Sequence, residues 1–380
     1  MVSLPRELAP ALPPVLGVQR TLRLLASSTA KHPQVVRILF YGQSITEGTW
    51  WQSVADSLRH RYPHADLVIE NRALGGFPSQ LLVKTAETDL YPFRPDLLIF
   101  HVFGAHDKYE DIVRRVRERT TAEILLQTDH VTDDAAFSEE TNPARLEPSG
   151  GDWGAFMNHR WIPTLATNYQ AGLCDQRAAW KLYLRAHGLH AAALLRDLVH
   201  LNADGERLMA ACVDHCLRRD PRRRASPAES WVATHVVGRD VAIAGDGTLR
   251  LVFRGNRVDV ILPAGRTSAS VTSATSAGGP APVVRIDGRR PSEWPELYGF
   301  TRARGTPGGK WPVVADLGWR TPLLLEDWTL ELTRDPARAD VVTFSLTGSK
   351  TGPDGGGRSD RRFESRSGRV IIDPDDWLLP

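Results

Sequence analysis

Cysteine is scarce in this sequence, which has only Cys174, Cys212 and Cys216 among its 380 residues. Three cysteines cannot build a disulfide framework. Cys212, His215 and Cys216 have a spacing that resembles a set of metal ligands, but a structural zinc site needs a further ligand and no distant candidate accompanies them. We therefore expect a fold held together by its apolar core, with no metal and no cofactor.

The sequence also lacks a long apolar run. It has no stretch of about 18 uninterrupted apolar residues, so we expect no membrane-spanning helix. The first residues have no basic segment and are interrupted by Pro5, Pro10, Pro13 and Pro14, which does not fit a secretory signal. We therefore expect a cytoplasmic protein with no membrane partner.

An excess of charge of one sign is missing as well. The 47 basic and 45 acidic residues give a formal charge of +2. Such a balance does not suggest a nucleic-acid partner. The short basic run from Arg218 to Arg224 is expected to be solvated linker. A small molecule or an oligosaccharide remains the more natural substrate, and the oligomeric state is open.

The length predicts two domains, because 380 residues exceed what one hydrophobic core usually organises. After an N-terminal extension at 1–34, residues 35–220 alternate short apolar runs with segments of helical spacing. This alternation is typical of an α/β domain whose parallel sheet is covered on both faces. The expected strands are 35–41, 67–70, 96–103 and 123–128, and the expected helices are 49–62, 109–119, 161–169, 176–187 and 203–218.

The segment 130–160 does not follow this alternation. It contains Asn142-Pro143, Pro148 and a Ser-Gly-Gly sequence at 149–151, and it shows little periodicity. A long loop of this kind inside a compact domain is often a lid or a binding loop. A mobile surface insertion is the other interpretation.

A linker at 221–230 precedes residues 231–380, where many short apolar runs are separated by Gly, Pro and Asp. Short strands with turn signals between them predict a β-sandwich-like accessory domain. The Gly-rich segment 347–366 is expected to be a loop, either a flexible one or one that reaches over the neighbouring active site. Six tryptophans in this region could stack on sugar rings or fill the core. The expected strands are 232–237, 249–253, 258–262, 283–286, 330–332, 341–346 and 370–372.

A serine follows the first predicted strand closely. The strand ends at Tyr41, Gly42 permits a tight exit, and Ser44 comes next. This order puts a hydroxyl at the carboxyl end of a parallel strand, where open α/β sheets bind their ligands. A turn or helix cap is the alternative role for Ser44.

A carboxylate and an imidazole stand together before the last predicted helix of the first domain. Asp197 precedes His200 by three residues, so a turn between them can bring the carboxylate to the ring. His200 could then act as a general base for Ser44, with Asp197 fixing the tautomer of the ring.

Four motifs in this order resemble the SGNH, or GDSL-type, hydrolases over Val35 to Leu217. The first is Gly42-Gln43-Ser44-Ile45, with Gln where the family commonly has Asp, and the second is the glycine-bearing 71–76. The third is Gly104-Ala105-His106-Asp107, and the last is the DxxH of 197–200. The resemblance implies a flavodoxin-like three-layer α/β/α domain.

The resemblance also implies roles for residues. Ser44 is expected to be the nucleophile, His200 the base and Asp197 the residue that orients it. An oxyanion hole is expected from the backbone N–H of Ser44, the N–H of Gly75 or Gly76, and a side chain of the third motif. His106 stands where the family has Asn, so it is expected to replace that donor, to weaken the hole, or to mark different chemistry.

Further side chains are candidates for substrate binding. Trp50 and Trp51 follow the nucleophile motif, and we expect one of them to line a pocket and the other to be buried. Glu47 is either a helix N-terminal carboxylate or a site residue. Asp107 is a turn residue or a second carboxylate, and the loop residues Trp153, Asn158 and His159 either approach substrate or lie on the surface.

Three functions are compatible with these residues. The leading hypothesis is a serine esterase that removes an acyl group, most simply acetyl, from a carbohydrate. The second is a glycoside hydrolase or transglycosylase that uses Asp107, Asp197 and Glu47. The third is a catalytically degenerate carbohydrate-binding protein, against which the presence of Ser44, His200 and Asp197 argues.

Overall fold

The structure is a computed structural model in which the chain divides into two units, Met1–Arg257 and Val258–Pro380. The predicted linker at 221–230 lies outside the described residues, and the predicted boundaries of the domains stay a prediction. The residues that the structure describes are 4–13, 15–149, 152–220, 233, 235–253, 313–314, 317–321, 324, 326–335 and 337–378.

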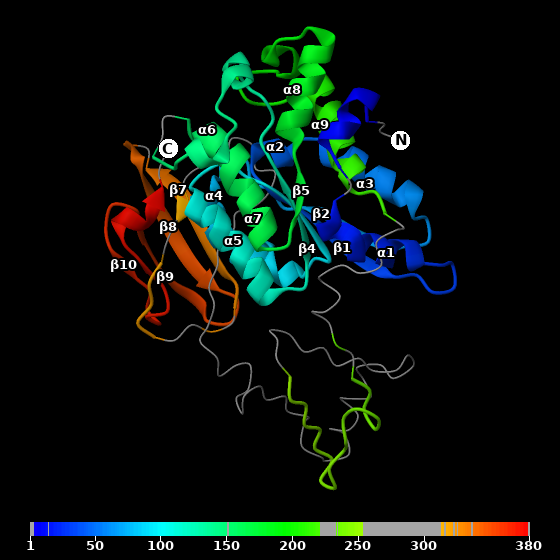
Figure 1. Cartoon of the computed structure of the whole chain (residues 1–380). Coiled ribbons are helices and arrows are strands. Elements are labelled where there is room, and N and C mark those ends of the chain that lie inside the picture. The colour runs from blue at the N-terminus through cyan, green and yellow to red at the C-terminus, as the bar shows by residue number, and fades with distance from the viewer. Residues whose placement is uncertain are drawn as a thin grey trace. The chain divides into compact units, whose positions relative to one another are not determined.

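The first unit is built on a five-stranded sheet with the order β2-β1-β3-β4-β5 (Figure 1). All four neighbouring pairs are parallel. This order is that of the flavodoxin-like folds, so the predicted α/β class is confirmed. The strands are β1 (Val35–Gly42), β2 (Asp66–Asn71), β3 (Leu97–His101), β4 (Glu123–Gln127) and β5 (Gly172–Cys174).

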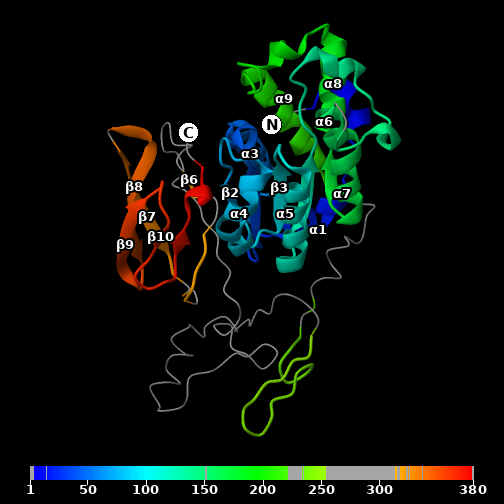
Figure 2. The same cartoon turned by 90° about the vertical axis from the view of Figure 1, so that its left-hand side faces the viewer.

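Helices cover both faces of this sheet, as the two views in Figures 1 and 2 show. Alternate strand residues point to opposite faces, so a strand that is buried on both sides is apolar throughout. Phe40 lies on one face against Trp50 of α3, and Phe100 lies on the other against Tyr109 of α5. The longer helices are α1 (Gln19–Ser27), α3 (Trp50–Arg61), α4 (Ser79–Asp89), α5 (His106–Arg119), α7 (Ile162–Asn168), α8 (Gln176–His187) and α9 (Ala203–Cys216).

The N-terminal segment is part of the core of this unit. Leu8 and Leu12 of its first turns, Val18, and Leu22 and Leu25 of α1 are at most 1% exposed and belong to the same apolar cluster as the strands. The segment expected to be an extension therefore contributes core side chains. Two short 3₁₀ helices precede α1, η1 (Arg6–Ala11) and η2 (Leu16–Val18).

The segment expected to be structureless contains short helices instead. Residues 134–138 and 143–145 form 3₁₀ turns, and α6 (Trp153–Ala155) continues into a π-helical turn, η6 (Phe156–Trp161). Phe156 and Met157 are buried. The sequence does not reveal this because each piece is too short to show a helical period.

The described part of the second unit is antiparallel. β7 (Trp328–Asp335), β8 (Arg338–Gly348) and β9 (Gly352–Arg358) form one sheet. The β-rich class is therefore confirmed. The expected strands at 258–262 and 283–286 lie outside the described residues, so the sandwich stays a prediction. Two further pairs are β10 (Phe363–Glu364) with β11 (Ile371–Ile372), and β6 (Val313–Val314) with β12 (Trp377–Leu378).

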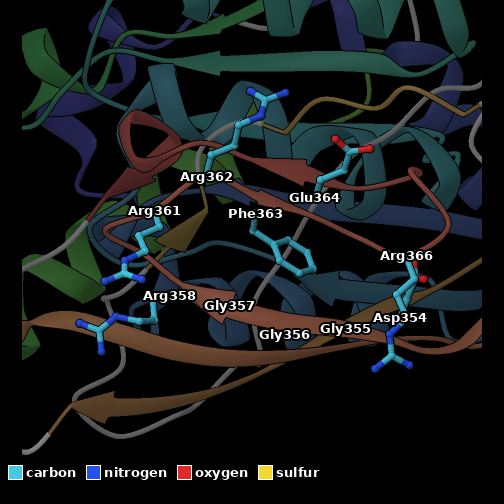
Figure 3. Close-up of a pocket in the computed structure, with 10 residues that line it drawn as sticks. All are labelled: Asp354, Gly355, Gly356, Gly357, Arg358, Arg361, Arg362, Phe363, Glu364 and Arg366. Carbon is cyan, nitrogen blue, oxygen red and sulfur yellow. The ribbon is translucent and has the colours of Figure 1, made fainter.

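The expectation that the Gly-rich segment forms a loop is wrong, because β9 runs through Gly355, Gly356 and Gly357. A Cβ atom on Gly357 would lie 3.0 Å from the rings of both Phe344 and Phe363. Figure 3 shows the Phe363 side chain among these glycines, in a hollow lined also by arginines. Glycine is needed here because aromatic rings pack against the strand itself.

The expected strands at 232–237 and 249–253 are not formed over their described residues, which contain only isolated bridges at Val237 and Leu249. Nothing in the described helices is both long and apolar enough to cross a membrane.

Candidate active site

Ser44, His200 and Asp197 form a continuous hydrogen-bonded chain. Nε2 of His200 lies 2.9 Å from Oγ of Ser44. Nδ1 of the same ring lies 2.9 Å from Oδ2 and 3.1 Å from Oδ1 of Asp197. With a proton on Nδ1, the ring donates to the carboxylate and accepts from the serine hydroxyl. The arrangement can therefore remove a proton from Ser44.

The turn that carries Asp197 and His200 is closed by its own backbone. Oδ1 of Asp197 accepts hydrogen bonds from the N–H groups of Val199 and His200, at 2.8 and 2.7 Å. The N–H of Arg196 donates to the carbonyl of His200 at 2.8 Å. A carboxylate that caps a turn in this way places itself beside the ring three residues later. This explains physically why the spacing in DxxH matters.

The same backbone hydrogen bonds control the charge of the carboxylate. The N–H donors of His200 and Val199 lower the pKa of Asp197 to about 2. Because this folded-state pKa is depressed, the stabilisation linked to it is present above the ordinary carboxyl pKa of about 4 and is lost as the pH falls below it. Asp197 is therefore an anion throughout the neutral range, as an orienting group for an imidazole should be.

The turn that carries Ser44 is held by side-chain hydrogen bonds to backbone carbonyls. Ser44 begins α2 (Ser44–Glu47) directly after β1. Oγ1 of Thr46 donates to the carbonyl of His101 at 3.2 Å, and Nδ2 of Asn71 donates to the carbonyl of Thr46 at 2.6 Å. The first and second motifs are thus joined by Asn71.

Gly75 of the second motif lies next to the serine. A Cβ atom on Gly75 would be 3.7 Å from Cβ of Ser44 and 2.2 Å from Oε2 of Glu47. Gly76 has a φ of +78°, which favours glycine. The structure therefore brings Gly75 and Glu47 to Ser44.

His106 is the first residue of α5 and is half-buried among aromatic rings. The centroid of its ring lies 4.8 Å from that of Trp161, 5.2 Å from that of Trp153 and 5.6 Å from that of Phe156, in each case with the two rings in a T-shaped arrangement. Nε1 of Trp161 donates to the carbonyl of His106 at 3.1 Å. The α6 and η6 segment thus restricts the orientation of this imidazole.

Two predicted substrate-binding residues are buried and have other roles. Trp50 is 1% exposed, packs against Phe40 and donates from Nε1 to the carbonyl of Ile45. Asn158 is 3% exposed, and all of its amide hydrogen-bonding groups are used within the fold, toward Asp129 and Gly154. Neither side chain is available to a substrate. Trp50 is thus the buried member of the Trp50–Trp51 pair, as expected for one of the two, and the assignment of Asn158 to substrate binding is corrected.

The remaining candidates for substrate binding are Trp51, Asp107, Trp153 and His159, and they differ in exposure and in contacts. Trp51 is half-buried and packs on Phe40 at 5.8 Å. The side chain of Asp107 is 59% exposed and pairs with Lys108 at 3.4 Å. Trp153 contacts His106, as described above. The ring of His159 lies 2.6 Å from the carboxylate of Glu139.

Sequence reasoning missed a group of buried polar residues near the carboxyl ends of β3 and β4. Nε2 of His101 lies 3.0 Å from Oδ1 of Asp129, and Nε2 of His130 lies 2.7 Å from the carbonyl oxygen of Val199. Polar residues directly after buried parallel strands were the signal that could have identified them.

The three cysteines are buried free thiols. Hydrogen bonding to Cys216 and burial raise the pKa of Cys174 well above its usual value, which keeps this thiol protonated and unreactive. Across the described ranges, no group of three or more His, Cys, Asp and Glu side chains is placed to hold a metal ion.

No family model and no curated protein matches the sequence. Solved structures do match. A two-domain esterase active on acetylated mannans is 21% identical over 55% of this chain, with a TM-score of 0.43. The match covers 56% of that esterase, so the chain spans little more than half of its length.

Two smaller proteins match over nearly their whole length. A protein described as a GDSL-like lipase, from Parabacteroides merdae ATCC 43184, is 18% identical, with 49% of this chain and 98% of that chain covered and a TM-score of 0.40. An acetyl xylan esterase is 20% identical, with 47% of this chain and 98% of that chain covered and a TM-score of 0.38.

Proposed function

We propose that this chain, whose first unit has the sheet order and the ordered motifs of the SGNH-type hydrolases, is a serine esterase. The observation that carries the proposal is the hydrogen-bonded chain from Asp197 through His200 to Ser44, with contacts of 2.9 Å on each side of the ring. Ser44 is 156 residues away from His200 in the sequence, and their meeting gives the order of carboxylate, imidazole and hydroxyl that nucleophilic catalysis by serine requires.

The reaction follows from this geometry. His200 takes the proton of the Ser44 hydroxyl while Oγ attacks the ester carbonyl, and Asp197 stabilises the imidazolium that forms. The imidazolium then protonates the departing alcohol, which leaves an acyl-serine. Water repeats the sequence: His200 removes its proton, and the acid is released as Ser44 regains a proton.

The oxyanion of each tetrahedral intermediate needs donors. We assign this role to the backbone N–H of Ser44, to the N–H of Gly75 or Gly76, and to the imidazole of His106. Gly75 lies beside Ser44, because a Cβ atom added to this glycine would be 3.7 Å from Cβ of Ser44. Donors fixed in advance stabilise the charge as it develops, and each typically contributes a few kcal/mol.

For the substrate we propose an acetyl ester on a neutral sugar. The formal charge of +2 suits a neutral ligand, and Trp153, half-buried beside His106, offers an aromatic face that could pack on a sugar ring. Acetylated mannan, on which the two-domain esterase named above acts, is the first polysaccharide to try.

The test is the Ser44→Ala variant assayed on p-nitrophenyl acetate and on acetylated manno-oligosaccharides. We expect kcat to fall by about 10⁴-fold or more, as removal of a serine nucleophile does in enzymes of this type. Ser53→Ala, at an exposed serine of α3, is the matched control and should retain full activity. A fluorophosphonate should label the wild type and Ser53→Ala but not Ser44→Ala.

Two outcomes would contradict the proposal. Unchanged ester turnover in Ser44→Ala would remove the role of Ser44. Release of reducing sugar that persists in Ser44→Ala would favour glycoside cleavage by carboxylates. The contacts of the carboxylates do not favour that reaction, because Asp197 is bound by its own turn and Asp107 pairs with Lys108.

A further inference from the structure

His130 makes a contact with the turn that carries the proposed base. It follows β4 by three residues, is 3% exposed, and packs its ring 5.7 Å from that of Trp180 in α8. Its Nε2 lies 2.7 Å from the carbonyl oxygen of Val199, which stands between Asp197 and His200. A buried side chain from a distant element thus reaches the backbone of the DxxH turn.

The protonation of His130 follows from its surroundings. A carbonyl oxygen only accepts, so Nε2 must carry a proton. Nδ1 is buried and has no hydrogen-bond partner among the residues that the structure describes. Burial, and secondarily the nearby His101, lower the pKa of His130 to about 4. His130 is therefore a neutral Nε2–H donor at neutral pH.

Beyond the hydrogen bonds that close it internally, the turn at Asp197 to His200 has little else to hold it in place. Leu198 and Val199 are 88% and 46% exposed, so apolar burial contributes little to holding the turn. The N–H of Val199 donates to Asp197 inside the same turn. Residues 197–200 make two hydrogen bonds to distant segments within the described part of the chain. One joins His200 to Ser44, and the other comes from His130 to the carbonyl of Val199.

His130 is itself held firmly. Nη1 of Arg177 donates to its carbonyl at 3.1 Å, and Nε of Arg177 also donates to Glu139 at 2.8 Å. The preceding residue, Asp129, pairs with His101, whose carbonyl accepts the hydroxyl of Thr46 in the nucleophile turn. The dipeptide Asp129-His130 is therefore linked to both halves of the proposed triad.

We propose that His130 is a positioning residue: its Nε2–H holds the carbonyl of Val199 and so fixes the Asp197–His200 turn at the correct distance from Ser44. This inference rests on the proposed esterase function. Misplacement of a catalytic group by about 1 Å can reduce a rate by about 100-fold, so one hydrogen bond that fixes a turn can have a large kinetic effect.

The test compares two substitutions that differ in the hydrogen bond. His130→Gln keeps an N–H donor at a similar reach, whereas His130→Phe keeps a ring and removes the donor. We expect His130→Phe to lower kcat on p-nitrophenyl acetate by about 10- to 100-fold with little change in KM. Fluorophosphonate labelling of Ser44 should slow by a similar factor, and His130→Gln should recover most of both rates.

A control separates positioning from general loss of stability. Leu184, fully buried in α8, lies in the same apolar core. Leu184→Ala should lower the melting temperature and leave kcat unchanged. If His130→Phe does not fold, His130→Asn replaces it, because the shorter amide cannot reach Val199. Two results would overturn the proposal. One is a kcat within about twofold of the wild type in the variant that lacks the donor. The other is an equal loss of kcat in that variant and in His130→Gln.

Failure of the esterase function would look different. In that case the wild type neither hydrolyses esters nor reacts with a fluorophosphonate. The position of the turn can then be read by NMR, from the His200 ring signals of the wild type and the variants. A shift in His130→Phe that is absent in His130→Gln supports the positioning role, and no shift in either overturns it.

Discussion

Ser44 owes its position to the backbone around it. At the end of β1, Gly42 is paired with His101 of β3. A Cβ atom on Gly42 would lie 2.0 Å from the carbonyl oxygen of His101 and 2.5 Å from Oγ1 of Thr46. The absence of a side chain thus lets two strands approach and lets Thr46 bond to His101. The sequence indicated a tight exit at Gly42 but not the partner that makes it tight.

Gly42→Ala should therefore separate β1 from β3 just before Ser44. We expect a loss of about 2 to 3 kcal/mol in the free energy of unfolding, as for other overpacked sites, together with a fall in ester turnover. Chemical denaturation and kcat on p-nitrophenyl acetate measure the two effects. Gly154→Ala is the control, since its Cβ would meet nothing closer than 3.6 Å. Equal stability of both variants would contradict the prediction.

His106 is the residue at which the third motif departs from the pattern of the SGNH-type hydrolases that the sequence resembles. Its ring is fixed by Trp153, Phe156 and Trp161, all from a segment whose structure the sequence did not indicate. The motif therefore identified the position, while the aromatic neighbours became visible only in the folded chain. An imidazole held in one orientation can present an N–H group as an amide does.

His106→Ala should lower kcat by about 100-fold and leave KM nearly unchanged, as loss of an oxyanion donor does. His106→Asn restores an N–H donor and should recover part of the rate. Steady-state kinetics on p-nitrophenyl acetate measure kcat and KM of both variants, and their melting temperatures show whether they are folded. An unchanged kcat in His106→Ala would exclude this side chain from the oxyanion hole.

At the scale of elements, the segment around Glu139 is anchored to α8 and η6. The side chain of Glu139 is 4% exposed and binds Arg177 and Lys181 of α8 and His159 of η6. Burial acts to raise the pKa of Glu139, but the hydrogen bonds from Arg177, His159 and Lys181 outweigh it and hold this pKa well below its usual range. The lid-like loop of the sequence interpretation is therefore tied down by a buried ion pair.

Glu139→Gln should lower the free energy of unfolding by about 3 kcal/mol at pH 7, because it leaves buried cations without their anion. The folded-state pKa of Glu139 is depressed, so its contribution is present above the unfolded pKa of about 4.3 and declines as the pH falls below it. The difference in unfolding free energy between wild type and variant should thus begin to narrow as the pH falls below about 4.3, by up to about 1.4 kcal/mol per pH unit.

Urea unfolding at several pH values measures that difference. Glu140→Gln is the matched control, since Glu140 is the next residue and its partner Arg145 has a side chain that is 73% exposed. A difference between wild type and Glu139→Gln that does not change with pH would contradict the ionised state of Glu139.

The Gly-rich strand β9 is an element that amino-acid composition alone fails to predict. Three consecutive glycines weaken a strand when it stands alone. Here Phe344 and Phe363 pack on the bare backbone of Gly357, and the pairing with β8 holds the strand. The partners that reverse the local preference are separated from it in sequence, so composition could not predict them.

At the scale of the molecule, the first unit needs its N-terminal residues. Leu22 of α1 is fully buried in the same cluster as β1, α3 and α9. Hydrophobic periodicity found the strands and most longer helices of this unit, but it missed α1, α4 and the three-residue β5. Short or weakly patterned elements depend on tertiary contacts, which periodicity does not report.

Leu22→Ala should lower the free energy of unfolding by about 3 kcal/mol, because it leaves a cavity in that core. Leu16→Ala is the matched control. Leu16 is 46% exposed, and its substitution should cost about 0.5 kcal/mol or less. Urea unfolding followed by circular dichroism measures both, and equal effects would show that the segment does not belong to the core.

The sequence by itself determined the α/β class of the first unit and singled out Ser44, His200 and Asp197 as candidates, which the structure joins by hydrogen bonds. Both depend on patterns that are local in the chain: apolar runs of strand length and short motifs in a fixed order. Tertiary structure decided which side chains from distant parts of the chain are in contact. It brought Ser44 and His200 together across 156 residues and buried Trp50 and Asn158. It also placed Nε2 of His130 within hydrogen-bonding distance of the Val199 carbonyl in the DxxH turn. Contacts of this kind depend on how distant elements pack, which no local pattern specifies.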